Sequence, residues 1–238
     1  MGWMLTLTVV IPVLDDAEPL ADCLAGLRSQ SVPVEVLVVD NGSTDDSVEV
    51  ARSAGVRVIV EQVPGIPAAA STGFDACSTD LVARIDTDTR VPHDWAARVI
   101  AAFDDESVDA VTGPGAFYGS NRVVHALGRL FYMRAYFASV APLVGQKPLF
   151  GSTYAIRRTV WNAVQVHRRP DVHDDMDLSF ALDGRYRIHY DPQLTVGISS
   201  RPITSVRNLA KHYWLAAVTI SVNWRERGPW RRWRSRAR

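Results

Sequence analysis

The sequence predicts an α/β fold in which a mostly parallel sheet is covered by helices on both faces. Through residues 5–112, apolar strand-like runs alternate with segments of helical periodicity. The strand-like runs are short and almost wholly apolar, which is typical of parallel strands buried on both faces. The chain has 238 residues, of which 47% are hydrophobic and 22% are charged. This composition fits one large globular domain with an appendage and argues against wholesale disorder.

The elements of the first half follow this alternation in order. Residues 5–13 alternate apolar residues with threonines, and the residues before them lack the basic side chains that open a signal peptide, so we expect a first strand here. Residues 17–30 repeat apolar side chains at the i, i+3, i+4, i+7 spacing of a helix, starting at Leu20. Similar patterns predict strands at 34–39, 56–60, 81–85 and 108–112, and helices at 45–54, 68–77 and 92–103.

The second half is less regular. Residues 121–140 predict a helix rich in aromatic side chains, and residues 141–150 predict a loop because they contain two prolines and a glycine. Residues 205–223 predict a helix that is polar and basic at its start and apolar toward its end, followed by a tail at 225–238. Shorter patterns predict strands at 153–156, 187–190 and 194–198, and helical segments at 159–164 and 174–183.

Neither a membrane-spanning helix nor a disulfide is expected. The longest uncharged apolar run, from Tyr213 to Val222, is about half of the roughly 20 residues that span a bilayer. Cys23 and Cys77 lack the CxxC spacing of a redox or metal site. We expect both to be free thiols in a cytoplasmic protein.

The formal net charge of zero conceals two opposite charges. Residues 201–238 carry ten Lys and Arg residues and a single acid, Glu226, whereas residues 1–200 carry 16 basic and 25 acidic residues. The chain therefore joins an acidic body to a basic, aromatic extension.

Acidic residues follow three successive predicted strands. Asp15 and Asp16 follow the first strand, Asp40 ends the second, and Asp86 and Asp88 follow the strand at 81–85. Ligands of parallel α/β sheets lie beyond the carboxyl ends of the strands. The sequence therefore predicts a binding crevice lined by these carboxylates.

Asp86 and Asp88 are candidates for a metal site. Two carboxylates at positions i and i+2 can meet on one cation if the chain turns, and oxygen ligands suit magnesium or manganese, which keep substrate phosphates in their other positions. The alternative is a solvated turn, since the DxD pattern is common by chance. Asp40 likewise has two interpretations, which do not exclude each other: it caps free amides at the start of the next helix, or it accepts a hydrogen bond from a bound base or ribose.

Asp174, Asp175 and Asp177 crowd the start of a predicted helix. Favourable interaction with the helix dipole explains such a cluster without any function. Mutual repulsion can also raise the pKa of one carboxyl and prepare it as a proton acceptor. Neither a Walker phosphate loop nor a GxGxxG motif is present in the sequence.

Four motifs in order carry a resemblance to a known family. IPVLDD, VVDNGSTD, RIDTD and HDDMDLS, spread over about residues 6–190, together resemble glycosyltransferase family 2. The resemblance implies the GT-A fold, a Rossmann-like three-layer sandwich, here with a C-terminal helical extension. It also implies inverting transfer of a sugar from a UDP- or GDP-sugar with manganese or magnesium. The implied organisation is a domain at 1–200, with a nucleotide-sugar half at 1–115 and an acceptor half at 116–200, and an extension at 201–238.

The resemblance implies donor-side roles for matching residues. Pro12, Val13 and Asp15 lie where the family's first loop meets the nucleotide base, and Asp40 matches the carboxylate that contacts the base. Asp86 and Asp88 match the pair that holds the ribose and the metal on the diphosphate.

Other implied roles concern the acceptor and the proton. Asp175 matches the general base that deprotonates the acceptor, with Asp174 beside it in the position of a glutamate. Gly151, with its neighbour Ser152, and Arg157 lie in the segment that shapes the acceptor side. His212 is either a further contact to the metal or diphosphate or an interfacial histidine.

Departures from the family pattern keep an alternative open. Ser71 and Thr72 replace a frequent Arg-Asn pair, and Asp174 is shorter than the usual glutamate. A catalytically weak relative that binds a sugar nucleotide or a partner is therefore the second hypothesis. No QxxRW motif of processive synthases is present, so single addition is preferred.

The partners of the basic extension are also open. Aromatic and arginine residues interleave at 121–144 and 214–233. They fit peripheral docking on the anionic inner face of the plasma membrane, which would favour a polyprenyl or other lipid-linked acceptor over a free glycan. A core helix with a loose terminus, or a homo-oligomer contact, fits as well. Nucleic acid is not expected, because no reading module accompanies the basic residues.

Overall fold

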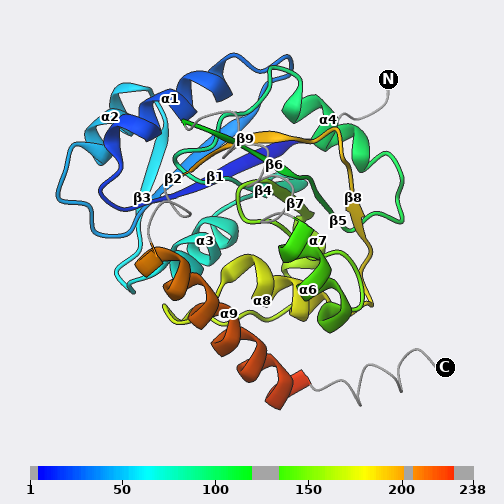
Figure 1. Cartoon of the computed structure of the whole chain (residues 1–238). Helices are drawn as coiled ribbons and strands as arrows, with labels where there is room; N and C mark the ends of the chain where they lie inside the picture. Colours follow the sequence, from blue (N-terminus) through cyan, green and yellow to red (C-terminus); the bar gives the residue numbers. More distant parts are fainter. Residues whose placement is uncertain (1–4, 120–133, 201–205, 228–238) are drawn as a thin grey trace.

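The computed structural model describes residues 5–119, 134–200 and 206–227, which build a three-layer α/β sandwich around a seven-stranded sheet (Figure 1). The order of the strands is β3-β2-β1-β4-β7-β5-β8, and only β7 runs antiparallel to its neighbours, β4 and β5. The strands are β1 (Leu7–Val13), β2 (Glu35–Asp40), β3 (Arg57–Val60), β4 (Leu81–Arg84), β5 (Ala110–Thr112), β7 (Tyr154–Arg157) and β8 (Ile188–Tyr190). The predicted mostly parallel sheet is thus confirmed.

Helices cover both faces of the sheet. In Figure 1, α1, α2 and α4 lie above it, α3, α6 and α8 lie below it, and α9 lies outside α8. The helices are α1 (Ala17–Arg28), α2 (Ser47–Ser53), α3 (Ile66–Asp75), α4 (Trp95–Ala102), α6 (Arg134–Val144), α7 (Arg158–Trp161), α8 (Asp174–Leu182) and α9 (Val206–Arg227). Successive side chains of a strand point to opposite faces, so Val9 and Ile11 pack toward α1 and α4, and Val10 packs toward α3. This two-sided burial explains the almost wholly apolar strand sequences.

A small second sheet lies beside the loop after β4. Its strands, β6 (Gly115–Tyr118) and β9 (Val196–Ser199), are parallel, and the backbones of Arg90 and Gly197 hydrogen-bond to each other at 2.8 and 2.9 Å. Strand β6 is not predicted from the sequence pattern, because it follows β5 after only a Gly-Pro pair. Through these bonds the second half of the chain supports the segment that follows Asp86.

Helix α6 corrects one prediction. The loop expected at 141–150 is wrong for its first four residues, because α6 continues through Pro142 to Val144. Val140 and Val144 are buried against Met176 and Phe180 of α8, and this packing outweighs the unfavourable proline. The start of the predicted helix, at 121–133, lies outside the described residues.

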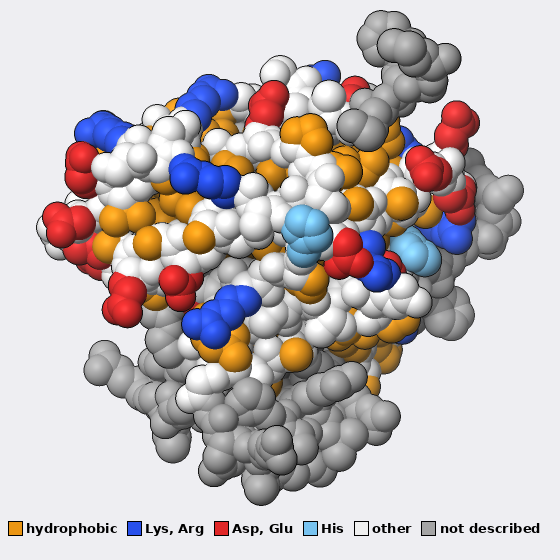
Figure 2. Space-filling model, turned by 90° about the horizontal axis from the view of Figure 1, so that it is seen from above, with side chains coloured by type: hydrophobic (Ala, Val, Ile, Leu, Met, Phe, Trp, Pro, Cys, Tyr) orange, Lys and Arg blue, Asp and Glu red, His pale blue; other side chains and the backbone are white. Residues whose placement is uncertain are grey.

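Helix α9 is longer than predicted and reaches Arg227, so the tail expected from 225 begins within a helix. No described helix has the length and apolar character needed to cross a membrane. On the face seen from above (Figure 2), acidic and basic side chains are interspersed rather than gathered by sign. Cys23 and Cys77 are free, as expected.

Candidate active site

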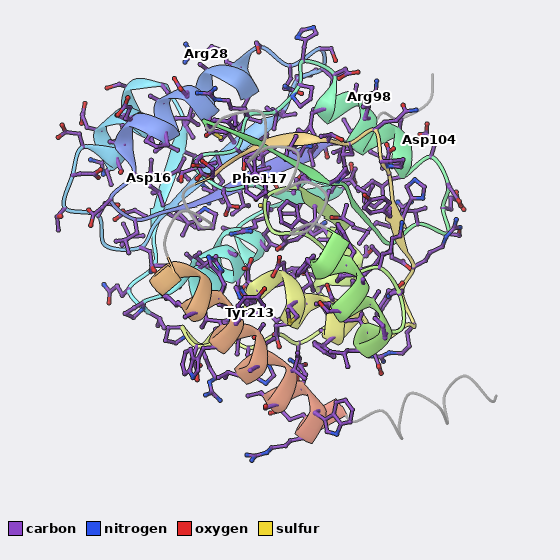
Figure 3. All side chains as sticks on the ribbon, viewed as in Figure 1. Asp16, Arg28, Arg98, Asp104, Phe117 and Tyr213 are labelled. Atoms are coloured by element: carbon purple, nitrogen blue, oxygen red, sulfur yellow. The ribbon has the colours of Figure 1, made fainter. Side chains whose placement is uncertain are left out.

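A cleft of about 510 Å³ opens at the carboxyl ends of β1 and β4. The loop after β1 forms one wall and the first half of α9 forms another; Asp16 and Tyr213, labelled in Figure 3, mark these two elements. Residues that line it are Pro12, Val13, Leu14, Asp16, Asn41, Gly65, Ile66, Pro67, Ala69, Arg84, Asp86, Thr87, Pro170, Val172, His173, Asp174, Lys211, His212 and Leu215. The position is the one that parallel α/β topology predicts for a ligand.

The loop after β1 places Asp16, rather than Asp15, in the cleft. Asp15 has a φ of +50°, a left-handed conformation that is uncommon outside glycine, asparagine and aspartate. Its carboxylate accepts hydrogen bonds from the backbone N–H groups of Thr44 (2.6 Å) and Asp45 (3.3 Å). Asp15 therefore ties this loop to the turn after β2. Asp16 accepts a hydrogen bond from the Thr87 hydroxyl, which connects the first and fourth strand ends.

Asp40 is buried and organises the turn that it starts. Its two oxygens accept hydrogen bonds from the backbone N–H groups of Ser43 (3.0 Å) and Gly42 (3.4 Å). The next residue, Asn41, lines the cleft, and sequence reasoning missed it. Its side-chain amide donates to the carbonyls of Glu61 and Val63 at 2.8 Å, while its oxygen accepts the N–H of Gly65 at 2.6 Å. Asn41 thus holds the segment that leads into α3.

Arg84 is a buried cation on the floor of the cleft, and it is the main residue that sequence reasoning missed. Only 3% of its surface is exposed, and one guanidinium nitrogen donates to Asp86 Oδ1 at 2.6 Å. Its Nε lies 3.3 Å from Asp174 Oδ2. The other oxygen of Asp86 accepts the Ser152 hydroxyl at 2.6 Å. The single charge inside the apolar run LVARI could have indicated this residue. A charge is rarely buried without a partner, so an arginine in a buried strand points to paired acids.

Position 151 requires glycine because the Arg84 guanidinium lies close to the backbone there. A Cβ atom there would lie 2.1 Å from Arg84 Nη1 and 3.2 Å from Asp175 Oδ2. The N–H of Gly151 donates to the same Asp175 oxygen at 2.8 Å. The backbone of Gly151 thus lies against Arg84 and Asp175, and its lack of a side chain permits this close approach.

The two acids at the start of α8 differ in environment. Burial, together with the neighbouring charge of Asp175, raises the pKa of Asp174 to about 6 despite the opposing charge of Arg84. Asp175 is held from three sides: Oδ1 accepts the Met176 N–H at 2.7 Å, and Oδ2 accepts the Gly151 N–H at 2.8 Å and the Tyr136 hydroxyl at 3.5 Å. Asp174 lines the cleft and Asp175 is fixed beside it.

The predicted metal ligands are only partly assembled. Asp86 and His212 both line the cleft, while Asp88, whose backbone carbonyl accepts the Tyr118 hydroxyl at 2.6 Å, does not line it. Within the described ranges, no three His, Cys, Asp or Glu side chains lie close enough to hold a metal by themselves. Two carboxylates at i and i+2 nevertheless fit an ion such as Mg²⁺, which takes one or two protein carboxylates and completes its shell with phosphate and water.

His212 stacks on His173, with ring centroids 5.5 Å apart and planes inclined by 5°. His173 Nε2 donates to the backbone carbonyl of His212 at 3.1 Å. Burial, together with the charge on His173, lowers the pKa of His212, which favours its neutral ring. This is the form that can ligate a metal.

Arg157 does not belong to this cleft. It pairs with Leu81 in the antiparallel register of β7, at the amino end of β4, whereas Asp86 follows the carboxyl end. Its guanidinium donates to the carbonyls of Phe103 and Val108 at 2.8 Å. The role expected for Arg157 on the acceptor side is therefore corrected to support of the loop before β5, because β7 runs in reverse.

Ser71 and Thr72, which replace the frequent Arg-Asn pair, face the protein interior and a neighbouring loop. Ser71 is buried and borders a cavity of about 10 Å³ that Tyr154 and Asp174 also line. The Thr72 hydroxyl donates to Glu61. Neither residue lines the cleft at the strand ends.

Two curated proteins that resemble the chain each align with less than half of it. Glycosyltransferase AglE of Haloferax volcanii is 35% identical over 115 residues, which is 44% of this chain and 38% of that protein. An undecaprenyl-phosphate 4-deoxy-4-formamido-L-arabinose transferase of Pseudomonas savastanoi pv. phaseolicola is 31% identical over 105 residues, or 40% of this chain and 31% of that protein. The chain thus covers less than half the length of either relative.

A solved structure shares the fold over nearly the whole chain. Glucosyl-3-phosphoglycerate synthase of Mycobacterium tuberculosis, in complex with Mn²⁺, UDP and glucosyl-3-phosphoglycerate, superposes with a TM-score of 0.69 at 22% identity. The match covers 92% of this chain and 80% of that one. The architecture is therefore the GT-A fold that the sequence resemblance implied. The family described as glycosyl transferase family 2 matches residues 8–162, about two thirds of the sequence, and the chain belongs to this family.

Proposed function

We propose that this chain transfers a sugar from a nucleoside diphosphate sugar, UDP- or GDP-linked, to a hydroxyl or phosphate acceptor, adding one sugar with inversion. The observation that carries the proposal is the cleft at the strand ends, where Asp86, Asp174 and the buried Arg84 meet. The family match and the UDP and Mn²⁺ in the complex of the structural neighbour support it.

On the donor side, we assign the base and ribose to the wall formed by Pro12, Val13 and Asn41. Asp40 lies under this wall, and each of its oxygens keeps a lone pair beyond the turn amide that it accepts. Asp15 fixes the loop after β1 by accepting a hydrogen bond from the backbone N–H of Thr44. The base is thereby held over the carboxyl ends of β1 and β2.

Asp86 and Asp88 are proposed to hold a divalent cation, Mn²⁺ or Mg²⁺, with His212 as a further contact. When bound, the cation offsets the negative charge that develops on the leaving diphosphate. Arg84 and Ser152 fix the two oxygens of Asp86 in one orientation. Because the Asp86 carboxylate is already oriented, it needs no reordering when the diphosphate arrives.

Asp175 is proposed as the general base. An alcohol is a poor nucleophile at neutral pH, so a carboxylate within reach of its proton assists attack on the anomeric carbon. The hydrogen bonds from Gly151, Met176 and Tyr136 fix the Asp175 carboxylate in place. Attack from the face opposite the leaving diphosphate gives inversion.

A lipid-linked acceptor, such as a polyprenyl phosphate or a lipid-linked glycan, is the favoured class. The relative named as an undecaprenyl-phosphate transferase supports this class. The exposed apolar residues Leu14 and Ile66 at the cleft are also suited to an acceptor with an apolar chain.

The decisive experiment measures release of the nucleoside diphosphate from UDP-, GDP- and dTDP-sugars with Mn²⁺ and lipid or glycan acceptors. We expect turnover by the unmodified chain and losses of about 100-fold or more for Asp88→Ala and Asp175→Asn. Asp104→Asn is the matched control, because Asp104 is exposed beyond α4 and away from the cleft (Figure 3). Equal activity of Asp175→Asn and the unmodified chain would refute the assignment of the base.

A weak relative that binds the sugar nucleotide without transferring it is the second candidate. The replacement of the Arg-Asn pair by Ser71 and Thr72, neither of which lines the cleft, favours it. Calorimetric binding of UDP with Mn²⁺, combined with no turnover of any donor, would select this candidate over the enzyme.

A further inference from the structure

The outer face of α9 exposes aromatic side chains where a surface helix ordinarily carries charged ones. Tyr213, Trp214 and Trp224 expose 67%, 57% and 51% of their surfaces. The opposite face of α9 packs on α8 through the buried Thr219 and Asn223. These three aromatic residues therefore contribute little to the core of the domain.

The exposed aromatic residues belong to one continuous arc of the helix. An α-helix turns by about 100° per residue, so an arc of about 120° contains the three aromatic residues and four other exposed positions. The arc consists of Ala210, Tyr213, Trp214, Ala217, Ser221, Trp224 and Arg225, and the exposed Lys211 and Glu226 lie outside it. Only Arg225 within the arc is charged. We call the residues of the arc the outer arc.

The segment that contains the outer arc carries a large positive charge. Residues 201–238 hold ten Lys and Arg residues against Glu226 alone. Tryptophan and tyrosine prefer the headgroup level of a bilayer, and basic residues are attracted to anionic lipids. A helix with aromatic residues on one face and basic residues around it is typical of a segment that lies in the membrane interface.

We propose that α9 docks on an anionic lipid bilayer through the outer arc, lying in the plane of the interface. A second copy of the chain would also cover aromatic residues. It would, however, bring two segments of the same large positive charge together, which opposes association. An anionic bilayer complements both the aromatic residues and the charge.

Docking places the cleft beside the lipid headgroups. Lys211, His212 and Leu215 line the cleft from the same turns of α9 that present Tyr213 and Trp214 outward. A substrate with its apolar chain in the bilayer and its reactive group at the surface then meets the cleft edge. The docking proposal stands apart from the proposed transfer reaction, because vesicle binding is measured without donor or acceptor.

The test is co-sedimentation of the full chain with vesicles of phosphatidylcholine alone and of phosphatidylcholine with phosphatidylglycerol. We expect binding to the anionic vesicles only, weakened by salt, with a blue shift of the tryptophan emission. The variant Tyr213→Ser, Trp214→Ser, Trp224→Ser should lose binding by about tenfold or more. The matched control is Val60→Ser with Val63→Ser, which removes exposed apolar side chains from β3 and the loop after it rather than from α9 and should bind normally.

Circular dichroism and the melting temperature establish that each variant is folded. Unchanged vesicle binding by the folded triple variant overturns the proposal, as does failure of the unmodified chain to bind anionic vesicles. A dimer in light scattering that the triple variant converts to a monomer, with no vesicle binding, assigns the outer arc to self-association instead.

Discussion

Arg84 is the residue on which the geometry of the cleft depends most. Its guanidinium contacts carboxylates from two distant parts of the chain, Asp86 and Asp174, and it is almost wholly buried. Removing one partner from a buried ion pair leaves the remaining charges without compensation. The arginine therefore supplies the buried counter-charge of both acids and holds them in position at the same time.

We predict that Arg84→Met lowers the free energy of unfolding by about 3 kcal/mol, because two acids lose their buried counter-charge. Urea denaturation at neutral pH measures this. The control is Arg98→Met, which breaks the exposed pair with Asp94 and should cost under about 1 kcal/mol. Equal losses for the two variants would show that Arg84 is not a buried cation.

We predict that Gly151→Ala lowers both stability and donor turnover, because the added Cβ displaces the Arg84 guanidinium from Asp86. We expect a loss of roughly 1–3 kcal/mol in the free energy of unfolding. Gly26→Ala is the matched control: its Cβ would lie 3.6 Å from Val91, which is ordinary contact, and alanine favours the helix α1. A neutral Gly151→Ala variant would contradict the close approach.

At the scale of elements, α9 is attached to the domain by a polar network around Asp177 of α8. Asp177 is fully buried, and one of its oxygens accepts hydrogen bonds at 2.7 Å from both His167 Nδ1 and Asn223 Nδ2. The other ring nitrogen of His167 contacts Glu226 near the end of α9 at 3.1 Å. This network holds in place the helix that forms one wall of the cleft.

We predict that the packing of α9 on α8 weakens as pH rises from 6.5 through the raised pKa of His167. Burial lowers the pKa of His167, but its hydrogen bonds to Asp177 and Glu226 outweigh burial and raise the pKa above the ordinary 6.5. A raised pKa means that the protonated ring stabilises the fold below pH 6.5, and that this contribution is lost as pH rises through the folded-state pKa. Melting temperatures across this range should fall with pH for the unmodified chain and change less for His167→Gln.

Elements also show what could be predicted from the sequence. The strand ends and their acids were predictable, because parallel strands place their carboxyl ends on one edge. Pro12, Val13, Asp86, Asp174 and His212 indeed line one cleft.

The places of other site residues could not be predicted, because they depend on contacts between segments that are distant in the sequence. The acids that pair with Arg84 are Asp86 and Asp174, so the apolar run around Arg84 could indicate a buried charge but not its partners. Arg157 was misplaced because the sequence of β7 does not reveal that it runs antiparallel. Asp15 was expected in the binding crevice, but Asp16 lines the cleft instead. The left-handed backbone at Asp15 turns its carboxylate toward Thr44.

At the scale of the whole molecule, the acidic body and the basic extension meet different ligands in our proposals. In these proposals, the acids at the strand ends bind a cation and a diphosphate, and the extension binds lipid. A cation that neutralises the cleft should therefore be needed before a nucleotide can bind.

We predict that UDP raises the melting temperature only when Mn²⁺ is present. A ligand that binds only the folded state stabilises it, by about 2.7 kcal/mol at 100 times its dissociation constant. Chelation of the metal, or Asp86→Ala, should abolish the shift, while Asp104→Asn should keep it. A full shift by UDP in the presence of a chelator would show that the Asp86 region does not need a metal for nucleotide binding.

The reversed strand β7 has a consequence for how this chain must fold. β4 pairs with β1 on one side and with β7, some seventy residues later, on the other. A nascent chain that has emerged only as far as β6 therefore exposes one edge of β4 without its partner, and such edges promote aggregation. The earlier and later parts of the chain are in this sense one cooperative unit, because the sheet is complete only when the later part inserts β7 between β4 and β5. Closure of such a long loop should slow the rate-limiting step of folding, so a fragment that ends before β7 should be recovered as insoluble material.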